Sequence, residues 1–568
     1  MLFRSLVEYC YSRRDEKEKE YFNKKNYHYP KQSYFSKIPG CPVAYWVANE
    51  TFEAFTQEHL VDHYTIRNGI STGDNERYLR LWHEVDYTRE YWKPCNKGGS
   101  YRKWYGNNEY YVYWKDNGMS IRTSLDDKGR IKARLGGIEF SFWQGIEMSR
   151  ITSGSLSFRI SEGGFIYESS TNDIYQSDDD WDLLTVLGYC NTKVVSYFLN
   201  LMNPTINIMP EDLRKLPCPL LNKKIITDFV LDNIQLSRED WDSFEKSWDY
   251  KRHPLICKTT IIENSFKQWQ MECDNRFNQM KSNEEKLNDI FIDFYGLQDE
   301  LTSEVEDKDV TVRKADLSRD IRSFISYAVG CMFGRYSLDK EGLIYAGGEW
   351  DSNRYKTFLP DDDNCIPITD EEYFSDDIVT RFAEFVKTVY GADTLEENLN
   401  FIANALDNKG DTSREVIRNY FLKDFYADHL KIYQKRPIYW LFDSGKQNGF
   451  KALIYMHRYD ADTVGRVRTD YLHRAQKYVE TAIQSAQYTI DNASSASEKS
   501  KATKAVTKYT KQLAEMKIYD EAIAHIANKR IEIDLDDGVK VNYEKFQGVE
   551  VAQEGKKALK VDLLAKLK

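Results

Sequence analysis

The spacing of hydrophobic and polar positions changes several times along the chain, and each change marks an expected segment. After Pro42, apolar residues recur at helical intervals, which predicts a helix that leads into a strand-rich region. That region runs from Ile66 to about Tyr175, where short β-branched and aromatic runs are cut by glycine and asparagine. Helical spacing returns in 181–205 and continues through 223–236 and 266–301.

The C-terminal half is expected to be mainly helical. Residues 323–456 mix helical stretches with glycine-punctuated segments, whereas 466–530 contain no Gly or Pro and predict an antiparallel helical hairpin that breaks near 491–500. In the tail, Asp536-Asp537-Gly538 predicts the turn of a short β-hairpin. The fold class expected is α+β and multidomain. The expected parts are an N-terminal connector and helix (1–61), a mixed strand-rich domain (62–221), a helical spacer (222–322), a mixed α/β domain (323–460), the helical hairpin (461–530), and a short β-hairpin with a basic tail (531–568).

Composition places the chain among folded proteins of the reduced cytoplasm. Aromatic residues make up 14% of the 568 residues and charged residues 30%, and the mean hydropathy is -0.65. The longest apolar runs fall short of the roughly 18 residues that a membrane helix needs. The first residues lack the pattern of a signal peptide. The nine cysteines form no CxxC pair, so we expect reduced thiols and a cytoplasmic location.

The net charge of -11 argues against a protein that coats DNA indiscriminately, because phosphate neutralisation supplies most non-specific affinity. The charge is unevenly distributed, however. Residues 64–160 hold 16 Lys and Arg against 11 Asp and Glu, and residues 466–530 hold 12 against 7. These two basic regions indicate localised contact surfaces, although a solvated helix face explains the second region nearly as well.

The segment Tyr91–Trp114 combines aromatic residues, cations and glycines in a way that suits nucleic acid. Its 24 residues hold nine aromatics, four cations and one acid. Gly98 and Gly99 let backbone N–H groups approach a ligand, nearby cations can meet phosphates, and Asn107 and Asn108 match the donor and acceptor pattern of adenine. A tyrosine-rich hairpin with solvated cations is an equally good interpretation of the composition alone.

Motifs for catalysis are absent from the sequence. It contains no P-loop, dinucleotide fingerprint, HExxH or nucleophile elbow. Asn203-Pro204-Thr205-Ile206 lacks the second proline and the aromatic residue of an adenine methyltransferase tetrad, and is better interpreted as a helix stop.

Several other polar residues suggest metal binding or catalysis, but each also has a simpler structural interpretation. Asp361–Asp363 suggest calcium, but Ile366 stands where that turn needs glycine, so a solvated loop is preferred. Glu532, Asp534, Asp536, Asp537 and Lys540 suggest a metal nuclease, with a hairpin turn as the simpler account. Structural roles are expected for His83, His457 and Arg458, and no base adjoins the Cys41 thiol.

Several stretches carry a family resemblance. IPGCPVAYWV, GISTGDNERYLRLWHEV, YWKPCNKGGSYRKWYGNNEYYVYW, SYAVGCMFGRYSLDKEGLIYAGGEWD and KRPIYWLFDSGKQNGFKALIYMHRYD, with others between Ile38 and Phe546, resemble PglX, the adenine-specific DNA methyltransferases of BREX phage-defence systems. The resemblance covers that family's C-terminal half. It implies a target-recognition domain and a helical region, with the S-adenosylmethionine site and the catalytic tetrad in a domain that has no counterpart here.

The resemblance also frames the recognition domain. Such domains open near a TG turn, here Thr72-Gly73, and close with an NSK-like helix at Asn191-Thr192-Lys193 and a proline-rich exit at Pro217-Cys218-Pro219. The DNA-binding candidates that it implies are Thr72, Asp74, Asn75, Lys97, Gly98, Gly99, Arg102, Lys103, Trp104, Asn107 and Asn108.

Two functions are therefore expected. The first is the DNA-recognition and scaffold half of a PglX-type adenine-N6 methyltransferase, inactive alone, with double-stranded DNA and a catalytic domain as partners and no cofactor or metal of its own. The second is a non-enzymatic interaction module that docks other BREX proteins or a phage inhibitor through 466–530.

Overall fold

The computed structural model describes residues 3–4, 13–23, 27–86, 88–152, 154–177, 182–219, 221, 223–407, 409–553 and 556–567. They form two compact units. The first comprises 1–79, 91–241 and 273–314, and the second comprises 80–90, 242–272 and 315–568. Both contain helices and strands, which confirms the α+β prediction.

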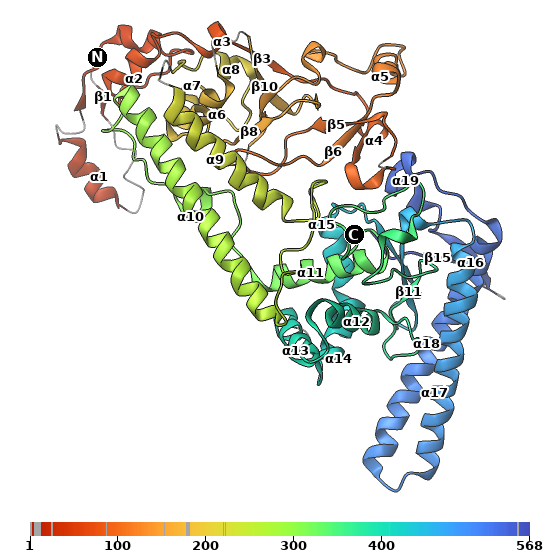
Figure 1. Ribbon diagram of the computed structural model, residues 1–568. Helices are drawn as coiled ribbons and strands as arrows, with labels where there is room; N and C mark the ends of the chain where they lie inside the picture. The colour runs from red at the N-terminus through yellow and green to blue at the C-terminus, as the bar shows by residue number, and fades with distance from the viewer. Residues whose placement is uncertain are drawn as a thin grey trace. The chain divides into compact units, whose positions relative to one another are not determined.

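The first unit is built around a four-stranded antiparallel sheet of order β3-β10-β7-β8 (Figure 1). β7, β8 and β10 are buried along almost their whole length, whereas β3 alternates buried and more exposed positions, as expected for a strand with one solvated face. In a second sheet, β5 pairs antiparallel with β6 and parallel with β9. The strands are β1 Phe3–Arg4, β2 Tyr27–His28, β3 Tyr64–Asn68, β4 Leu79–Leu81, β5 Trp92–Asn96, β6 Tyr110–Tyr113, β7 Gly145–Ser149, β8 Phe158–Ser161, β9 Ile166–Tyr167 and β10 Thr171–Gln176.

Helices that follow the sheet complete the core of the first unit. Asp182 caps α6, because its carboxylate accepts the N–H groups of Leu184 and Thr185 at 3.0 and 3.3 Å. α7 ends at Met202, and its C-cap residue Asn203 stands directly before Pro204, as the sequence predicts. The helices are α1 Arg14–Tyr21, α2 Asn49–Ala54, α3 Leu60–His63, α4 Asn75–Tyr78, α5 Lys115–Arg122, α6 Leu183–Cys190, α7 Lys193–Met202, α8 Pro210–Arg214, α9 Lys223–Asp242 and α10 Ile262–Tyr295.

The prediction of a single helix after Pro42 is wrong. Two short helices, α2 and α3, occupy this stretch. The Asp62 carboxylate accepts the backbone N–H of His59 at 2.8 Å, and His59 forms a β-bridge with Pro217. These contacts start a new helix at Leu60, so the apolar positions face the core from two helices.

The second unit combines a small sheet with helices and a long helical arm. β11 Ile366–Pro367, β13 Lys451–Tyr455 and β12 Tyr439–Asp443 form the sheet, and β14 Val549–Gln553 pairs with β15 Lys556–Val561. The helices are α11 Leu317–Met332, α12 Ile378–Tyr390, α13 Leu395–Leu406, α14 Ser413–Lys423, α15 Phe425–Ile432, α16 Thr463–Arg466, α17 His473–Asn492, α18 Ala496–Lys529 and α19 Gly538–Glu544. In the part of the chain that the structure describes, no helix has an apolar stretch of the length that a membrane crossing requires.

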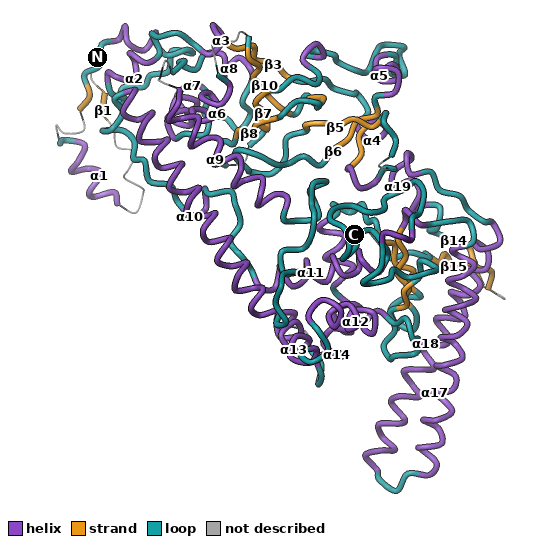
Figure 2. Tube along the Cα trace, in the orientation of Figure 1, coloured by secondary structure: helices purple, strands orange, loops and turns teal. Residues whose placement is uncertain are grey.

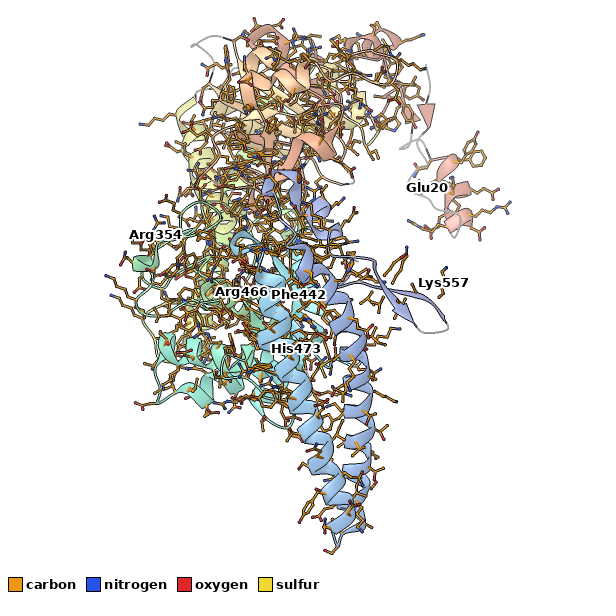
Figure 3. All side chains as sticks on the ribbon, turned by 90° about the vertical axis from the view of Figure 1, so that its right-hand side faces the viewer. Glu20, Arg354, Phe442, Arg466, His473 and Lys557 are labelled. Atoms are coloured by element: carbon orange, nitrogen blue, oxygen red, sulfur yellow. The ribbon has the colours of Figure 1, made fainter. Side chains whose placement is uncertain are left out.

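The predicted helical hairpin is confirmed as the arm formed by α17 and α18. Figure 2 shows the two helices side by side, joined by a short loop at their far end. Arg466 and His473 mark the root of the arm in Figure 3. Between α16 and α17 the chain forms a π-helix, Val467–Leu472.

The prediction of a β-hairpin turn at Asp536-Asp537-Gly538 is wrong, because these residues lead into α19. Arg80 donates to the carbonyl oxygens of Asp536 and Asp537 at 3.0 and 3.1 Å. The Asn542 amide donates to Asp534 O at 2.6 Å. These bonds hold the chain in the entry to a helix, and the tail hairpin forms later, as β14 and β15.

Candidate nucleic-acid interface

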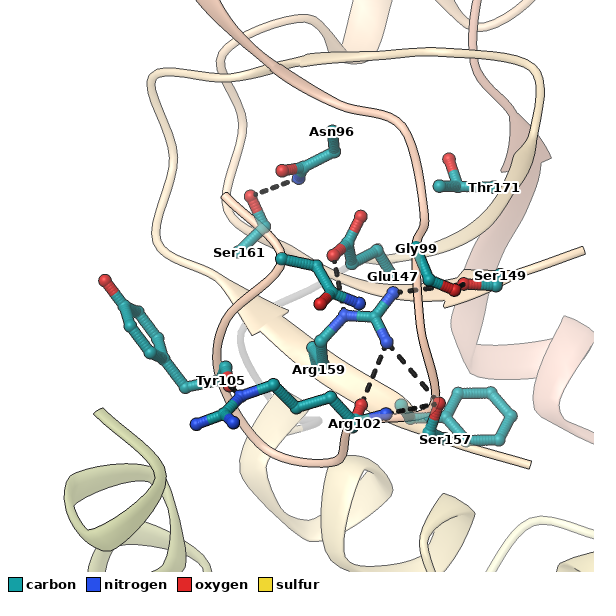
Figure 4. Close-up of polar contacts among 12 residues, drawn as sticks. Asn96, Gly99, Arg102, Tyr105, Glu147, Ser149, Ser157, Arg159, Ser161 and Thr171 are labelled. Carbon is teal, nitrogen blue, oxygen red and sulfur yellow. Dashed lines mark hydrogen bonds and ion pairs between the residues drawn. The ribbon is translucent and has the colours of Figure 1, made fainter. Parts of the chain in front are cut away.

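Residues 97–108 form a loop whose middle adds to the edge of the four-stranded sheet. Trp104 N–H donates to Phe158 O, and Ile160 N–H donates to Trp104 O, each at 2.9 Å. The fully buried Arg159 on β8 supports this addition (Figure 4). Its guanidinium binds the Glu147 carboxylate and the Arg102 carbonyl oxygen, each at 2.9 Å. The loop backbone is therefore fixed by the sheet.

Arg102 points into the protein. Its Nη1 lies 2.8 Å from the Asp240 carboxylate on α9, and its Nη2 donates to Ser237 O at 2.7 Å. The guanidinium also lies 5.1 Å from the centre of the Trp241 ring. Burial raises the pKa of Asp240, but Arg313 and Arg102 outweigh it and hold the pKa below its usual value. Asp240 is therefore ionised and paired.

Lys103 and Trp104 share a second buried carboxylate, Glu284 on α10. Lys103 Nζ lies 2.7 Å from one oxygen of Glu284, and Trp104 Nε1 donates to the other at 2.8 Å. Burial acts to lower the pKa of Lys103, yet the Glu284 charge outweighs it and raises that pKa. A direct contact between DNA and the side chain of Arg102, Lys103 or Trp104 would have to break these internal bonds. That these three residues bind DNA remains a prediction.

The remaining candidates of this loop stabilise turns or reach the surface. Gly98, Gly99 and Asn107 have positive φ angles of 71°, 139° and 61°. The Asn107 amide donates to Ser100 O at 2.9 Å, and both Asn107 and Asn108 are buried. Lys97 is half-buried, with its ammonium 4.6 Å from the centre of the Tyr110 ring. Lys97 is thus the cation of this loop that a ligand reaches most directly.

The TG turn is a compact hydrogen-bonded structure. Thr72 Oγ1 donates to the Asn75 side chain at 2.6 Å and accepts the Asp74 N–H at 3.1 Å. The Asp74 carboxylate caps α4 by accepting the Arg77 N–H at 3.2 Å. Thr72 is buried, and Asn75 is exposed. Ser71, directly before the turn, exchanges two backbone hydrogen bonds with Arg134 at 2.8 and 2.9 Å.

An arginine-lined hollow of about 540 Å³ lies beside this turn. Arg67, Arg134, Arg150 and Arg214 line it, and Glu211 is the one acid among its lining residues. The other lining residues are Asn68, Gly69, Ser71, Gly136, Gly137, Ser169, Met209 and Pro210. Four guanidinium groups with hydroxyl and glycine backbone groups form a surface suited to phosphate.

The four arginines differ in availability. Arg214 is paired with Glu211 at 2.9 Å, and Arg150 donates to the Asn207 side chain at 3.1 Å. Arg67 and Arg134 are exposed, and neither forms an ion pair within the described ranges. These two side chains can meet a phosphate without breaking an internal contact.

The sequence-based candidate set does not include these arginines. They are single residues in different parts of the chain that the fold brings together. Arg67 lies on β3, Arg134 exchanges backbone hydrogen bonds with Ser71, and Arg214 on α8 donates to Ile66 O. The local positive charge of 64–160 was the available signal. It indicated the region and could not indicate which cations face outward.

Groups considered for other chemistry have internal partners. His83 and His457 are buried, and each lies 3.3 Å from a backbone carbonyl oxygen through Nε2. Asp361 and Asp363 both accept the Cys365 N–H at 3.0 Å. Among the described residues, no three His, Cys, Asp or Glu side chains are arranged to hold a metal ion.

A comparison with models of protein families finds no match. Among curated proteins, the chain is similar to two adenine-specific methyltransferases. One, PglX of Lacticaseibacillus casei (strain Zhang), is 44% identical over 548 residues, which cover 92% of this chain and 46% of PglX. The other, BrxX of Escherichia coli O9:H4 (strain HS), is 33% identical over 555 residues, which cover 91% of this chain and 45% of BrxX.

The chain therefore matches part of a PglX-type protein, which confirms the resemblance found in the sequence. It spans less than half the length of either relative.

Proposed function

We propose that this chain is the DNA-recognition and scaffold part of a PglX-type adenine-specific DNA methyltransferase. The observation that carries the proposal is the arginine-lined hollow beside the TG turn, in the same unit as the Lys97–Asn108 loop. Arg67, Arg134 and Lys97 would bind phosphates of the duplex. The similarity to two adenine-specific methyltransferases supports adenine as the base that the whole protein would modify.

Within this proposal the buried pairs have a positioning role. Arg102 and Lys103 join the loop to α9 and α10 through Asp240 and Glu284. A rigid loop loses little conformational freedom when DNA binds, which favours affinity. The hollow is a poor match for S-adenosylmethionine, because that cofactor carries a cationic sulfonium. We therefore assign the hollow to DNA alone.

Binding of the full chain to fluorescent duplexes at graded salt tests the proposal. The logarithm of the binding constant should fall linearly with the logarithm of the salt concentration. Each of Arg67→Gln and Arg134→Gln should reduce the steepness by about 0.9, the value for one lost phosphate contact. Lys308→Gln is the matched control, because Lys308 is a surface cation of the same unit with 73% of its side chain exposed.

The control should leave the salt dependence unchanged. The proposal fails if the unmodified chain shows no salt-dependent affinity for duplex DNA, or if the control and the two arginine variants are equally affected.

A second candidate function rests on the arm. Lys501, Lys504, Lys508 and Lys511 recur every three or four residues on α18, so they share one face. Lys508 pairs with Asp370, and the other three are exposed and form no ion pair with the described residues. Such a stripe suits an acidic surface of another protein, as in a defence complex or a phage inhibitor.

Capture of partner proteins after nuclease treatment tests this second candidate. Lys501→Glu with Lys504→Glu should reduce capture strongly, whereas Lys529→Glu, at the opposite end of the same helix, should have little effect. Equal capture by all variants would contradict a role for the stripe.

A further inference from the structure

Two neighbouring aromatic side chains are exposed in the turn that leads into β7. Phe142 is 41% exposed and Trp143 is 51% exposed. The turn begins at Gly137, which lines the arginine hollow, and continues through a 3-10 helix, Ile138–Phe140. The aromatic pair is thus joined to the hollow by a few residues of chain.

The backbone of this turn is held in a strained conformation. Phe142 has a φ angle of 71°, in the left-handed region that a bulky side chain rarely adopts. Its N–H donates to Phe165 O at 2.6 Å, and its carbonyl oxygen accepts the Gly164 N–H at 3.0 Å. Strain of this kind persists only where the surrounding structure fixes it, and it is frequent at ligand-binding sites.

The side-chain framework around the turn is equally fixed. The Tyr167 hydroxyl donates to Trp143 O at 2.8 Å. The Phe140 ring stacks on Tyr175 of β10 at 4.6 Å between ring centres. Phe140 thus anchors the turn to the sheet. The Trp143 ring packs edge-on against Phe140 at 5.3 Å between ring centres, and the Phe142 ring packs edge-on against Trp114 at 6.5 Å. The turn therefore supports both rings and leaves a large part of each exposed.

The chemistry of the surroundings points to a nucleobase as the partner of these rings. Within the described residues, the Trp143 indole has no hydrogen-bond partner. Arg67 and Arg134 lie at the hollow where the turn starts, so a ligand that covers both features must carry anionic groups beside a flat apolar face. A nucleotide has both, and base stacking on an aromatic side chain contributes about 1–3 kcal/mol.

We propose that Phe142 and Trp143 form an aromatic wedge that inserts between base steps of the bound duplex and stacks on a base exposed there. This inference rests on the proposed function, because the arginine hollow must bring the duplex to the turn. A ring inserted between base steps partly unstacks them, which makes a neighbouring base easier to open.

The test uses the full chain and random-sequence duplexes in which 5-iodouracil replaces thymine, so the recognised motif need not be known. Near-ultraviolet light joins 5-iodouracil to a stacked aromatic side chain, and mass spectrometry locates the bond. We expect cross-links at Phe142 or Trp143. In Trp143→Ala the cross-link at Trp143 should be lost, in Phe142→Gly the cross-link at Phe142 should be lost, and Trp143→Ala should lower the affinity about tenfold, the equivalent of about 1.4 kcal/mol.

Trp46→Ala is the matched control, because Trp46 is also 51% exposed in the same unit. It should leave cross-linking and affinity unchanged. Phe142→Gly keeps the left-handed backbone and separates loss of the ring from misfolding of the turn.

The outcomes separate the two proposals. Salt-dependent binding with cross-links only outside the turn, or unchanged affinity in Trp143→Ala, overturns the wedge and leaves the proposed function standing. Loss of a nuclease-resistant protein partner in Trp143→Ala, with DNA binding intact, would assign the turn to a protein interface and also overturn the wedge. An absence of duplex binding by the unmodified chain overturns both.

Discussion

Arg102 and Lys103 show what the local sequence can and cannot predict about the role of a single side chain. The sequence indicates two adjacent cations among tyrosines and glycines, which is typical of a phosphate-binding loop. Their partners, Asp240 and Glu284, lie 138 and 181 residues away along the chain. Local pattern cannot reveal such pairs, because only the packing of α9 and α10 against the loop creates them.

The Glu284 carboxylate is expected to be the sensitive point of this loop. Glu284→Gln leaves the Lys103 ammonium buried without a counter-charge, so the free energy of unfolding should fall by about 3–5 kcal/mol. Urea unfolding followed by tryptophan fluorescence measures the change. Adding Lys103→Met to Glu284→Gln should restore much of the loss, because the uncompensated charge is then removed.

Glu306→Gln is the control for this experiment, since Glu306 pairs with Lys308 on the exposed surface. It should change the urea midpoint little. An unaltered midpoint in Glu284→Gln would show that the buried pair does not stabilise the loop.

At the scale of elements, long periodic segments were predictable and short ones were not. The arm follows from a stretch without Gly or Pro in which apolar residues recur at helical spacing. The prediction of a hairpin turn at Asp536-Asp537-Gly538 failed because of Arg80, which is far away in sequence. Arg80 donates to the carbonyl oxygens of Asp536 and Asp537 and so helps to hold this segment at the start of a helix. The π-helix before α17 left no signal in the sequence pattern, although it places the Tyr471 hydroxyl 2.9 and 2.8 Å from the carboxylates of Asp363 and Asp376.

The acidic loop near this π-helix gives a pH prediction. Burial, with the charge of Asp363 adding to it, raises the pKa of Asp361 to about 7, against an ordinary value of 3.8. The folded state therefore binds this proton more tightly than the unfolded state. Between about pH 4 and about pH 7 the free energy of unfolding should fall as pH rises, by at most about 1.4 kcal/mol per pH unit from this group.

Asp361→Asn removes the titrating carboxyl and should flatten this part of the stability profile. Urea unfolding at several pH values, compared between the variant and the unmodified protein, isolates the contribution of Asp361. Parallel profiles would contradict the assigned pKa shift.

At the scale of the whole molecule, the negative net charge and the proposed DNA contact are compatible because the basic groups are local. The arginine hollow draws most of its arginines from a segment with excess positive charge, while acids elsewhere keep the total at -11. The sequence predicted that segment and the α+β class. It could not predict the division into two units, because each unit is assembled from three separate stretches of the chain.

If the proposed function is right, a protein of these 568 residues should bind duplex DNA and transfer no methyl groups by itself. The sequence contains neither a glycine-rich methyl-donor loop nor a tetrad that holds a flipped adenine. Incubation with duplex DNA and labelled S-adenosylmethionine should give incorporation at background, with an active adenine methyltransferase as the positive control. Incorporation by this chain above background would contradict the expectation.

The two buried carboxylates that hold the 97–108 loop also decide how this part of the molecule can be exchanged between relatives. A chimaera cut at residue 221 would separate Arg102 from Asp240 and Lys103 from Glu284. In a recipient without acids at positions 240 and 284, the transplanted piece would carry two buried cations without counter-charges. The unit that contains the loop therefore includes 91–241 and 273–314, so an exchange that keeps both pairs has to carry the parts of α9 and α10 that hold Asp240 and Glu284.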